Sequence, residues 1–437
     1  MANDIKNQKD ILEKLGIEAL NPMQQEALAV IEKTANTILL SPTGTGKTLA
    51  FLLPLIENLD IDNPEVQALI VVPTRELAIQ IEQVVRDMGS GFKVNAVYGG
   101  RSKSKDKIEL KHTPAILIGT PGRILDHFDD DRFSKASIND LVLDEFDKSL
   151  EIGFESEMRE ILNDLPAVRR RILTSATQGV EIPGFVNLNK PTIIEYLSDK
   201  KDPKLAINTV ISPDKDKLET LFELVQFLGN QPGIIFCNFR ESIERVSDFL
   251  TEKKISHTCF SGGMEQKDRE RALIKFRNGT SQILVATDLA ARGIDIPELK
   301  FIIHYELPHA AAEFTHRNGR TARVNEKGTA YVLQWKNQRL PDFIEKTEPI
   351  TIPKAKTNGN EVWETLFISG GRKDKISKGD IAGLFIKEGK IAQDQLGVIE
   401  LKQDCAFVAV PQKLANQLVN KLNNSKLKKK KVRIHIL

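Results

Sequence analysis

One stretch of the sequence decides the fold: Thr37-Ile38-Leu39-Leu40-Ser41-Pro42-Thr43-Gly44-Thr45-Gly46-Lys47-Thr48. Its first four residues form an apolar run that suits a buried strand, and the next apolar run, Leu49-Ala50-Phe51-Leu52-Leu53, suits the start of a helix. A strand, a glycine-rich turn and a helix in this order direct backbone N–H groups toward a phosphate. The stretch therefore predicts an α/β domain with a phosphate-binding loop at residues 41–48, the phosphate loop.

Two side chains of the phosphate loop carry its chemistry. Lys47 supplies a cation for the terminal phosphates of a nucleotide, and the Thr48 hydroxyl is placed to bind Mg²⁺. Ser41 stands where the strict pattern has glycine. A chance glycine-rich turn is the alternative, and the flanking strand and helix argue against it.

Short apolar runs recur along the chain, and several end in small, polar or charged clusters. Strands buried on both faces of a parallel sheet read as such continuous runs, and open α/β sheets bind ligands at the ends of these strands. The runs are residues 68–72, 94–98, 115–118, 141–143 and 171–173, then 233–237, 282–286, 301–303 and 329–333. The sequence predicts two tandem parallel-sheet domains (1–200 and 205–340), a polar, Pro/Lys-rich linker (341–360) and a small α+β domain (361–437).

The bulk composition is that of a globular protein, with 41% hydrophobic and 28% charged residues among 437. The first residues lack the apolar run of a signal peptide, and no stretch is apolar and long enough to span a bilayer. Three widely separated cysteines, Cys237, Cys259 and Cys405, favour a reducing, cytoplasmic location. Residues 361–437 carry 15 Lys/Arg against 8 Asp/Glu, which gives this segment a net charge of +7, whereas the rest of the chain has a net charge of −5. This basic segment favours a nucleic-acid partner, with a solubilising tail as the alternative.

An acidic cluster, Asp144-Glu145-Phe146-Asp147, follows one of the apolar runs. Asp144 is placed to hold Mg²⁺ through water, and Glu145 is placed to orient or deprotonate an attacking water. An acidic turn by itself is usually a solvated loop. Because this one follows a phosphate loop by about a hundred residues, it is the expected second half of a nucleotide-hydrolysing site.

A basic cluster, His316-Arg317-Asn318-Gly319-Arg320-Thr321-Ala322-Arg323, lies in the second sheet domain. On a helix Arg320 and Arg323 share a face, so two guanidinium groups converge on one place, which suits a γ-phosphate. The alternative is a basic surface helix. If these arginines complete the site of the first domain, hydrolysis depends on closure of the two domains.

Taken together, these motifs resemble those of the DEAD-box RNA helicases, in the same order and over nearly all of residues 16–335. The first domain has a Q-motif-like stretch (Gly16–Gln24), the phosphate loop, Pro73-Thr74-Arg75-Glu76-Leu77-Ala78, Gly99-Gly100, Thr120-Pro121-Gly122-Arg123, the acidic cluster and Ser175-Ala176-Thr177. The second domain has Ile234–Asn238, Ala286–Asp295 and the arginine cluster. Departures from the family pattern include Phe146 for alanine and Asn318 for isoleucine, and Leu20-Asn21 replaces Pro-Thr.

The resemblance implies an ATP-dependent RNA helicase with two RecA-like domains, ATP and Mg²⁺ as cofactors, and RNA as partner. It places ATP on Gln24, Ser41, Pro42, Thr43, Gly44, Thr45, Gly46, Lys47, Thr48, Gly293 and Asp295, with Mg²⁺ near Thr48 and Asp144. Catalysis would fall to Lys47, Asp144, Glu145, Arg320 and Arg323. RNA contacts would come from Thr74, Arg75, Gly100, Thr120, Pro121, Arg123, Thr287 and Asp288. Coupling between nucleotide and RNA would run through Asp147, Ser175, Thr177 and His316.

The basic C-terminal segment has the order strand, helix, strands, helix and strand of an RNA-recognition-motif (RRM) fold. Together with Gly-Arg-Lys-Asp-Lys-Ile-Ser-Lys-Gly-Asp (371–380) it resembles the RNA-binding domain of the DbpA subgroup. That resemblance implies binding of large-subunit ribosomal RNA during ribosome assembly, with Lys373, Lys375 and Lys378 among the contacts. For Phe367 and Phe407 we favour core packing over base stacking.

Three alternatives are open: a DNA translocase of the same superfamily, a non-enzymatic RNA-binding scaffold, and a tail that docks a protein. The motif sequences favour RNA over DNA, and the intact Lys47, Asp144, Glu145, Arg320 and Arg323 favour an enzyme. We expect a monomer.

Overall fold

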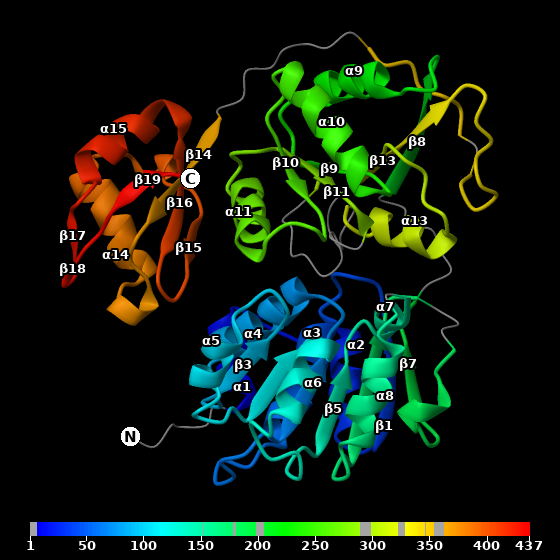
Figure 1. Ribbon diagram of the computed structural model, residues 1–437, viewed down its shortest axis with the longest axis vertical. Coiled ribbons are helices and arrows are strands. Elements are labelled where there is room, and N and C mark those ends of the chain that lie inside the picture. Colours follow the sequence, from blue (N-terminus) through cyan, green and yellow to red (C-terminus); the bar gives the residue numbers. More distant parts are fainter. Residues whose placement is uncertain are drawn as a thin grey trace. The chain divides into compact units, whose positions relative to one another are not determined.

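The computed structural model describes residues 7–151, 153–177, 181–197, 205–288, 299–321, 328–345, 347–353 and 362–437. The chain divides between residues 197 and 205 into two compact units. The first unit is one α/β domain (domain 1), and the second combines another α/β domain (domain 2) with a small C-terminal domain (Figure 1). The predicted fold class is confirmed.

The described residues of domain 1 form a parallel sheet of seven strands in the order β3-β4-β2-β5-β6-β1-β7. The order is not sequential, so helices return the chain between parallel strands. The strands are β1 (Asn36–Leu40), β2 (Ala68–Val71), β3 (Val94–Val97), β4 (Ile116–Gly119), β5 (Asp140–Leu143), β6 (Arg170–Ser175) and β7 (Thr192–Glu195).

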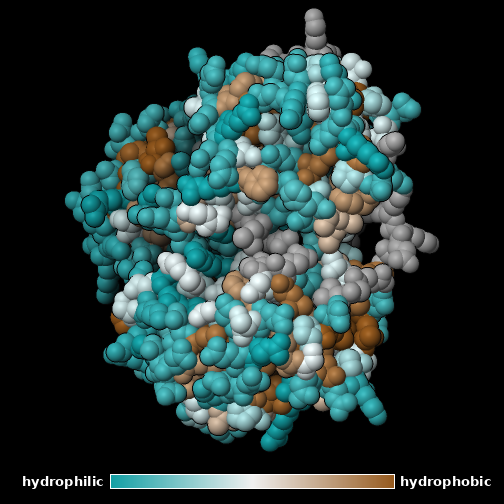
Figure 2. All heavy atoms as spheres, turned by 45° about the vertical axis from the view of Figure 1, so that its right-hand side comes forward, coloured by the Kyte–Doolittle hydropathy of each residue, from teal (hydrophilic) through white to brown (hydrophobic). Residues whose placement is uncertain are grey.

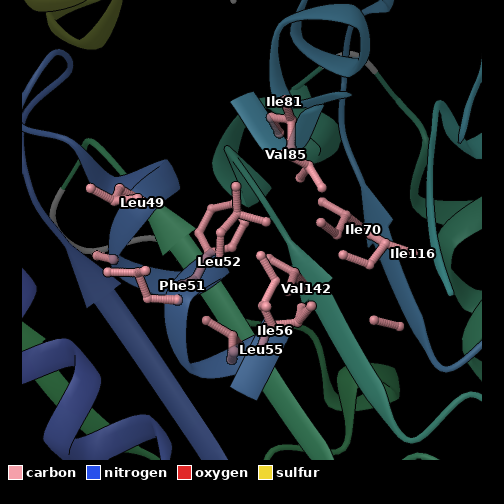
Figure 3. Close-up of a cluster of buried hydrophobic side chains, with 14 of the residues drawn as sticks. Leu49, Phe51, Leu52, Leu55, Ile56, Ile70, Ile81, Val85, Ile116 and Val142 are labelled. Carbon is pink, nitrogen blue, oxygen red and sulfur yellow. The ribbon is translucent and has the colours of Figure 1, made fainter. Parts of the chain in front are cut away.

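Helices cover both faces of this sheet, and alternate strand residues face two separate cores. Leu52 and Ile56 of α3 pack with Ile70 of β2 and Val142 of β5 in the first core (Figure 3). The neighbour of Ile70, Leu69, faces the second core. The helices are α1 (Gln8–Leu15), α2 (Pro22–Ile31), α3 (Lys47–Glu57), α4 (Arg75–Met88), α5 (Lys103–Glu109), α6 (Pro121–Asp129), α7 (Phe146–Glu151) and α8 (Glu155–Asn163), with a 3₁₀ turn η1 (Gly184–Val186).

In domain 2 the described residues form a parallel six-stranded sheet in the order β10-β11-β9-β12-β13-β8. The strands are β8 (Leu205–Ser212), β9 (Gly233–Phe236), β10 (His257–Phe260), β11 (Ile283–Ala286), β12 (Phe301–His304) and β13 (Gly328–Trp335). The helices are α9 (Leu218–Leu228), α10 (Arg240–Glu252), α11 (Gln266–Arg277) and α13 (Ala311–Asn318).

The structure differs from the predicted linker at residues 341–360, because its first part packs on domain 2. Ile344 is buried in a small apolar cluster with Leu340 and Phe314. The Ile350 N–H donates to the Thr209 carbonyl at 2.9 Å, which adds a backbone bond at the edge of β8. Because the segment is mostly polar, its composition did not reveal that Ile344 and Ile350 are fixed to domain 2.

The C-terminal domain has an antiparallel four-stranded sheet in the order β15-β16-β14-β19, as in an RRM-like fold. The predicted order of strands and helices is confirmed. The elements are β14 (Trp363–Ile368), η2 (Arg372–Asp374), α14 (Lys378–Gly383) continued by the π-helical turn η3 (Leu384–Glu388), η4 (Gln393–Gln395), β15 (Ile399–Leu401), β16 (Ala406–Pro411), α15 (Gln412–Leu422), the hairpin β17 (Lys426–Leu427) and β18 (Lys430–Lys431), and β19 (Ile434–Ile436).

The two phenylalanines of this sheet do not point into its core. Leu366 and Ile368 of β14 lie in the buried cluster, so Phe367 between them faces the opposite side. Phe407 pairs with Phe367 across the strands and shares that side, with ring centroids 5.6 Å apart. The preference for packing in this core was therefore wrong for Phe367, whereas Phe407 is buried, with 7% of its surface exposed, on the side away from the core of its own domain.

The face of the molecule in Figure 2 is predominantly hydrophilic. Within the described parts of the chain, none of the helices has the length and apolar character needed to cross a membrane.

Candidate functional site

Three neighbouring strands of domain 1 bring the predicted nucleotide residues to one edge. In the sheet β5, β6 and β1 are adjacent and parallel, so their carboxyl ends lie together. Asp144 follows β5, Ser175 ends β6, and Ser41 follows β1. Open α/β sheets bind their ligands at such an edge, so topology alone gathers these residues, which are spread over more than a hundred positions of sequence.

The phosphate loop has the backbone that its glycines predict. Gly44 and Gly46 have φ angles of 81° and 87°, in the left-handed region. Ser41, which replaces a glycine, has its hydroxyl 2.8 Å from that of Thr45 and so braces the loop. Lys47 begins α3 and its ammonium donates to the carbonyls of Pro42, at 3.1 Å, and Ser41. Its charge therefore lies within the loop, with Thr43 in the same turn and Thr48 as the second residue of the helix.

The residues of the Q-motif-like stretch rest on the phosphate loop. Asn21 caps α2 in a capping box with Gln24, and its side-chain amide donates to the Thr45 carbonyl at 3.0 Å. The Gln24 amide donates to the Gly46 carbonyl at 3.2 Å. Gln24 thus contacts the phosphate loop, and a contact with ATP stays a prediction. Asn21 was missed as a site residue, and its signal was the preference of asparagine for a helix N-cap before proline.

Asp144 is the most deeply buried acid of the site. Its carboxylate accepts from the Thr174 hydroxyl and from the Glu145 N–H, the latter at 3.2 Å. Burial raises the pKa of Asp144, while the Thr174 hydrogen bond and the nearby Lys47 charge oppose that shift. Glu145 has a φ angle of 49°, a strained value for a residue other than glycine, and such strain concentrates at functional positions. Thr174 was not predicted as a site residue.

Three of the residues predicted to couple nucleotide and RNA, Asp147, Ser175 and Thr177, lie side by side in domain 1, whereas His316 lies on α13 of domain 2. The Thr177 hydroxyl donates to the Asp147 carboxylate at 2.9 Å. Ser175 accepts from the Thr177 N–H at 3.0 Å, so it acts on Thr177 rather than directly on Asp147. Phe146, the departure in the acidic cluster, is buried in the second core of domain 1, which agrees with a packing role.

The predicted RNA residues of domain 1 gather at the other half of the same edge, after the adjacent strands β3, β4 and β2. Arg75 lies against the turn at Gly99-Gly100: a Cβ on Gly100, whose φ is 80°, would come within 2.5 Å of the Arg75 guanidinium. Thr74 caps α4, with its hydroxyl accepting from the Leu77 N–H at 3.3 Å. After β4 the predicted pair Thr120 and Pro121 begins α6, whose N-terminal N–H groups suit a phosphate.

Arg123 points inward rather than toward solvent, with only 7% of its surface exposed. Its guanidinium donates to the Tyr98 and Arg101 carbonyls and pairs with the buried Asp106 at 3.1 Å. Asp106 also contacts His127 at 3.1 Å. The structure therefore makes Arg123 a brace for the glycine turn, and a direct contact with RNA stays a prediction.

Arg317 organises the corresponding edge of domain 2. It is 1% exposed, pairs with both Asp288 oxygens at 2.7 and 2.5 Å, and donates to the Glu306 carbonyl at 2.7 Å. It also donates to the Asn238 side-chain oxygen at 2.7 Å. One side chain thus joins the ends of β9, β11 and β12. The carboxylate of Asp288, predicted to meet RNA beside Thr287, is committed to this pair, so an RNA contact there falls to its backbone.

The arginine cluster begins on α13 and its first part is buried. His316 and Arg320 are both 7% exposed. Asn318 contacts the buried ring of His304 at 3.0 Å. Three predicted site residues, Gly293, Asp295 and Arg323, lie outside the described residues.

The C-terminal domain presents a basic surface around its first helix. Ser377 and Asp380 form the capping box of α14, and two ion pairs tie the β17–β18 hairpin to this loop: Lys428 with Asp380 at 2.9 Å, and Lys430 with Asp374 at 2.7 Å. Several basic side chains are left exposed or half-exposed around these pairs: Lys373, Lys375, Lys378, Lys429, Lys431 and Arg433. The predicted Lys373, Lys375 and Lys378 thus belong to one surface.

Three family matches cover most of the chain. The DEAD/DEAH box helicase family matches residues 21–182, and the helicase conserved C-terminal domain matches residues 216–325. The DbpA RNA binding domain matches residues 365–436.

Two bacterial relatives match over nearly the full length. The ATP-dependent RNA helicase DbpA of Escherichia coli is 32% identical, and the match covers 98% of this chain and 96% of that protein. The ATP-dependent RNA helicase DbpA of Bacillus subtilis is 30% identical, and the match covers 97% of this chain and 96% of that protein. Among solved structures, S. cerevisiae Dbp5 bound to RNA and ADP BeF3 has a TM-score of 0.68 and 25% identity, covering 76% of this chain and 89% of that one. Mss116p bound to ssRNA and AMP-PNP has a TM-score of 0.69 and 26% sequence identity, and the match covers 76% of this chain and 73% of that one. The chain belongs to the DEAD-box ATP-dependent RNA helicases, in the group with a DbpA RNA-binding domain.

Proposed function

We propose that this helicase uses ATP with Mg²⁺ to open short structured segments of large-subunit ribosomal RNA during ribosome assembly, as a cytoplasmic monomer. One observation carries the proposal: a single sheet edge holds the nucleotide residues after β5, β6 and β1, and the predicted RNA residues after β3, β4 and β2. A nucleotide bound at one half of this edge would therefore lie close to an RNA bound at the other half.

The residues of the nucleotide half fit ATP and a divalent cation. Gly44 and Gly46 allow a loop of backbone N–H groups, Lys47 supplies a positive charge, and the Thr48 hydroxyl suits a cation. Burial raises the pKa of Asp144, and a divalent cation nearby would favour its ionised form. When bound, Mg²⁺ supplies charge stabilisation for the phosphates.

In the proposed reaction water attacks the terminal phosphorus, the bond to the bridging oxygen breaks, and ADP leaves with phosphate. Glu145 orients the water and takes up its proton, and Lys47 stabilises the charge on the phosphate oxygens. Arg320 and Arg323 would complete this stabilisation from domain 2, and Gly293 and Asp295 would contact the ribose side of ATP. This division makes turnover depend on domain closure.

RNA binding would couple to this step through the Asp147–Thr177 bond, because both residues follow strands of the nucleotide half. Arg75, Gly100, Thr120 and the backbone near Thr287 would contact phosphate and sugar. Such contacts carry no base information, which suits an enzyme that acts on many sequences. His316, from domain 2, would take part in this coupling when the two domains close.

Choice of RNA would rest with the C-terminal domain and its basic surface at Lys373, Lys375 and Lys378. The test measures ATP hydrolysis with large-subunit ribosomal RNA, an unstructured RNA and DNA of equal length. Ribosomal RNA should stimulate most, and equal stimulation by DNA would refute RNA specificity. Removal of residues 360–437 should reduce affinity for ribosomal RNA and flatten its salt dependence, and unchanged affinity would refute the role of the tail.

A further inference from the structure

The sheet of the C-terminal domain has one face that its own core does not use, the outer face. Strand alternation puts Trp363, Thr365 and Phe367 of β14 on this face, because Leu366 and Ile368 point inward. Glu400 of β15 pairs with Phe407 and lies on the same side, as does His435 of β19, which pairs with Phe367. RRM folds present stacking aromatics to RNA on the corresponding face.

Half of the outer face is already covered by domain 2. The Arg277 guanidinium, at the end of α11, donates two bonds to the Glu400 carboxylate, at 2.7 and 2.9 Å. The Asn278 amide donates to the Thr365 hydroxyl at 3.2 Å, and the Thr280 hydroxyl is 2.7 Å from the same oxygen. These contacts join segments more than eighty residues apart.

Burial supports a real interface at this place. Thr365 is fully buried, although it points away from the core of its own domain, and Asn278 is also buried. The bonds from Asn278 and Thr280 compensate the Thr365 hydroxyl for the water that it loses on burial. The Arg277–Glu400 pair is bidentate and its side chains are only 26% and 15% exposed, which is the geometry of a strong, specific ion pair.

We propose that the outer face of the C-terminal sheet is a docking surface for the corner between α11 and β11 of domain 2. The two domains then move as one body, and an RNA bound to the basic surface of the tail is held at a fixed place relative to domain 2. The half of the sheet at Trp363, Thr365 and Glu400 is not an RNA-binding surface.

A disulfide can report on this docking in the full-length protein. A Cβ at Gly279 would lie 3.8 Å from the Trp363 Cβ, the separation typical of a disulfide. In a Cys259→Ser, Cys405→Ser background, Gly279→Cys with Trp363→Cys should crosslink within the chain on mild oxidation. Gly279→Cys with the exposed Val398→Cys is the matched control. Crosslinking no faster than in the control would overturn the proposal.

Charge reversal tests the ion pair independently. Adding Glu400→Arg to the cysteine pair should slow crosslinking about tenfold or more, and adding Arg277→Glu as well should restore it. Arg271→Glu, on the same helix but with 43% of its side chain exposed, should leave the rate within about twofold. Equal rates for all of these variants would show that the pair does not hold the domains together.

RNA distinguishes docking from base recognition on this face. An excess of ribosomal RNA should leave the crosslinking rate within about twofold, and the crosslinked protein should bind that RNA as tightly as the reduced one. If RNA suppresses crosslinking, or the crosslink abolishes RNA binding, this half of the face binds RNA and the proposal fails.

Discussion

The buried pair His304–Asn318 makes the stability of domain 2 depend on pH. His304 ends β12 with no exposed surface, and its Nε2 lies 3.0 Å from the Asn318 Oδ1. Within the described part of the chain its Nδ1 has no hydrogen-bond partner, so a second ring proton would be buried without an acceptor. Burial, helped by the nearby Arg317 charge, lowers the pKa of His304 from 6.5 to about 3.

The direction in which stability changes with pH follows from proton binding to His304. Between pH 6.5 and about 3 the unfolded chain binds a proton at His304 that the folded chain does not, so stability falls as the pH falls through this window. At pH 7.5 the ring is neutral in both states and contributes almost nothing. At pH 5.5, one unit below the unfolded pKa, the loss is about 1.4 kcal/mol. Acidification from pH 7.5 to 5.5 should therefore cost domain 2 about 1.4 kcal/mol through this ring.

The measurement is urea unfolding at both pH values, followed by Trp335 fluorescence. The chain has two tryptophans, so Trp363→Phe leaves Trp335 of domain 2 as the reporter. The starting protein should lose about 1.4 kcal/mol more than His304→Asn on acidification. His309→Asn, an exposed histidine of the same domain, is the control and should behave like the starting protein. Equal losses in His304→Asn and the starting protein would refute the reasoning.

Further substitutions test the sites. Lys47→Ala and Glu145→Gln should each lower RNA-stimulated ATP hydrolysis roughly a hundredfold or more, and unchanged turnover would contradict their roles. Thr177→Val removes the bond to Asp147 and should reduce duplex unwinding much more than ATP hydrolysis; an equal loss of both would argue against coupling. Arg317→Ala leaves the largely buried Asp288 unpaired and should destabilise domain 2 by roughly 3–5 kcal/mol in urea unfolding. Asn21→Ala removes both the helix cap and the bond to the Thr45 carbonyl, so it should cost about 1 kcal/mol in domain 1 and weaken ATP binding, whereas Asn21→Thr should retain the cap and its stability but not that bond.

The parallel sheets could be predicted because strands buried on both faces must be apolar at every position. The predicted run 68–72 contains β2 (Ala68–Val71), and the predicted run 94–98 contains β3 (Val94–Val97). The polar residues after these runs could be assigned to one edge for the same reason. The edge strand β7 was not predicted, since two of its apolar positions, Ile193 and Ile194, are split between solvent and core.

The contacts that hold the site could not be predicted, because they depend on strand order and on pairs far apart in sequence. Arg317 meets Asp288 and Asn238 only because β9, β11 and β12 are adjacent. Asn318 stood out from the family pattern with no visible reason, and the structure supplies one in His304. The asparagine that replaces the isoleucine of the family pattern at position 318 is thus paired with a histidine fourteen residues earlier, His304.

The short connection to the C-terminal domain strengthens the case for docking. Because Ile350 is hydrogen-bonded to domain 2, only the short stretch of sequence between residues 353 and 362 connects the described parts of the two domains. A connection of this length spans at most roughly 30 Å even when fully extended. The tail is therefore present near α11 at an effective concentration of about the millimolar range, so a contact that would be weak between separate proteins is sufficiently populated here. At such an effective concentration, one bidentate ion pair and the Thr365 hydrogen bonds contribute enough to favour the docked arrangement of the two domains.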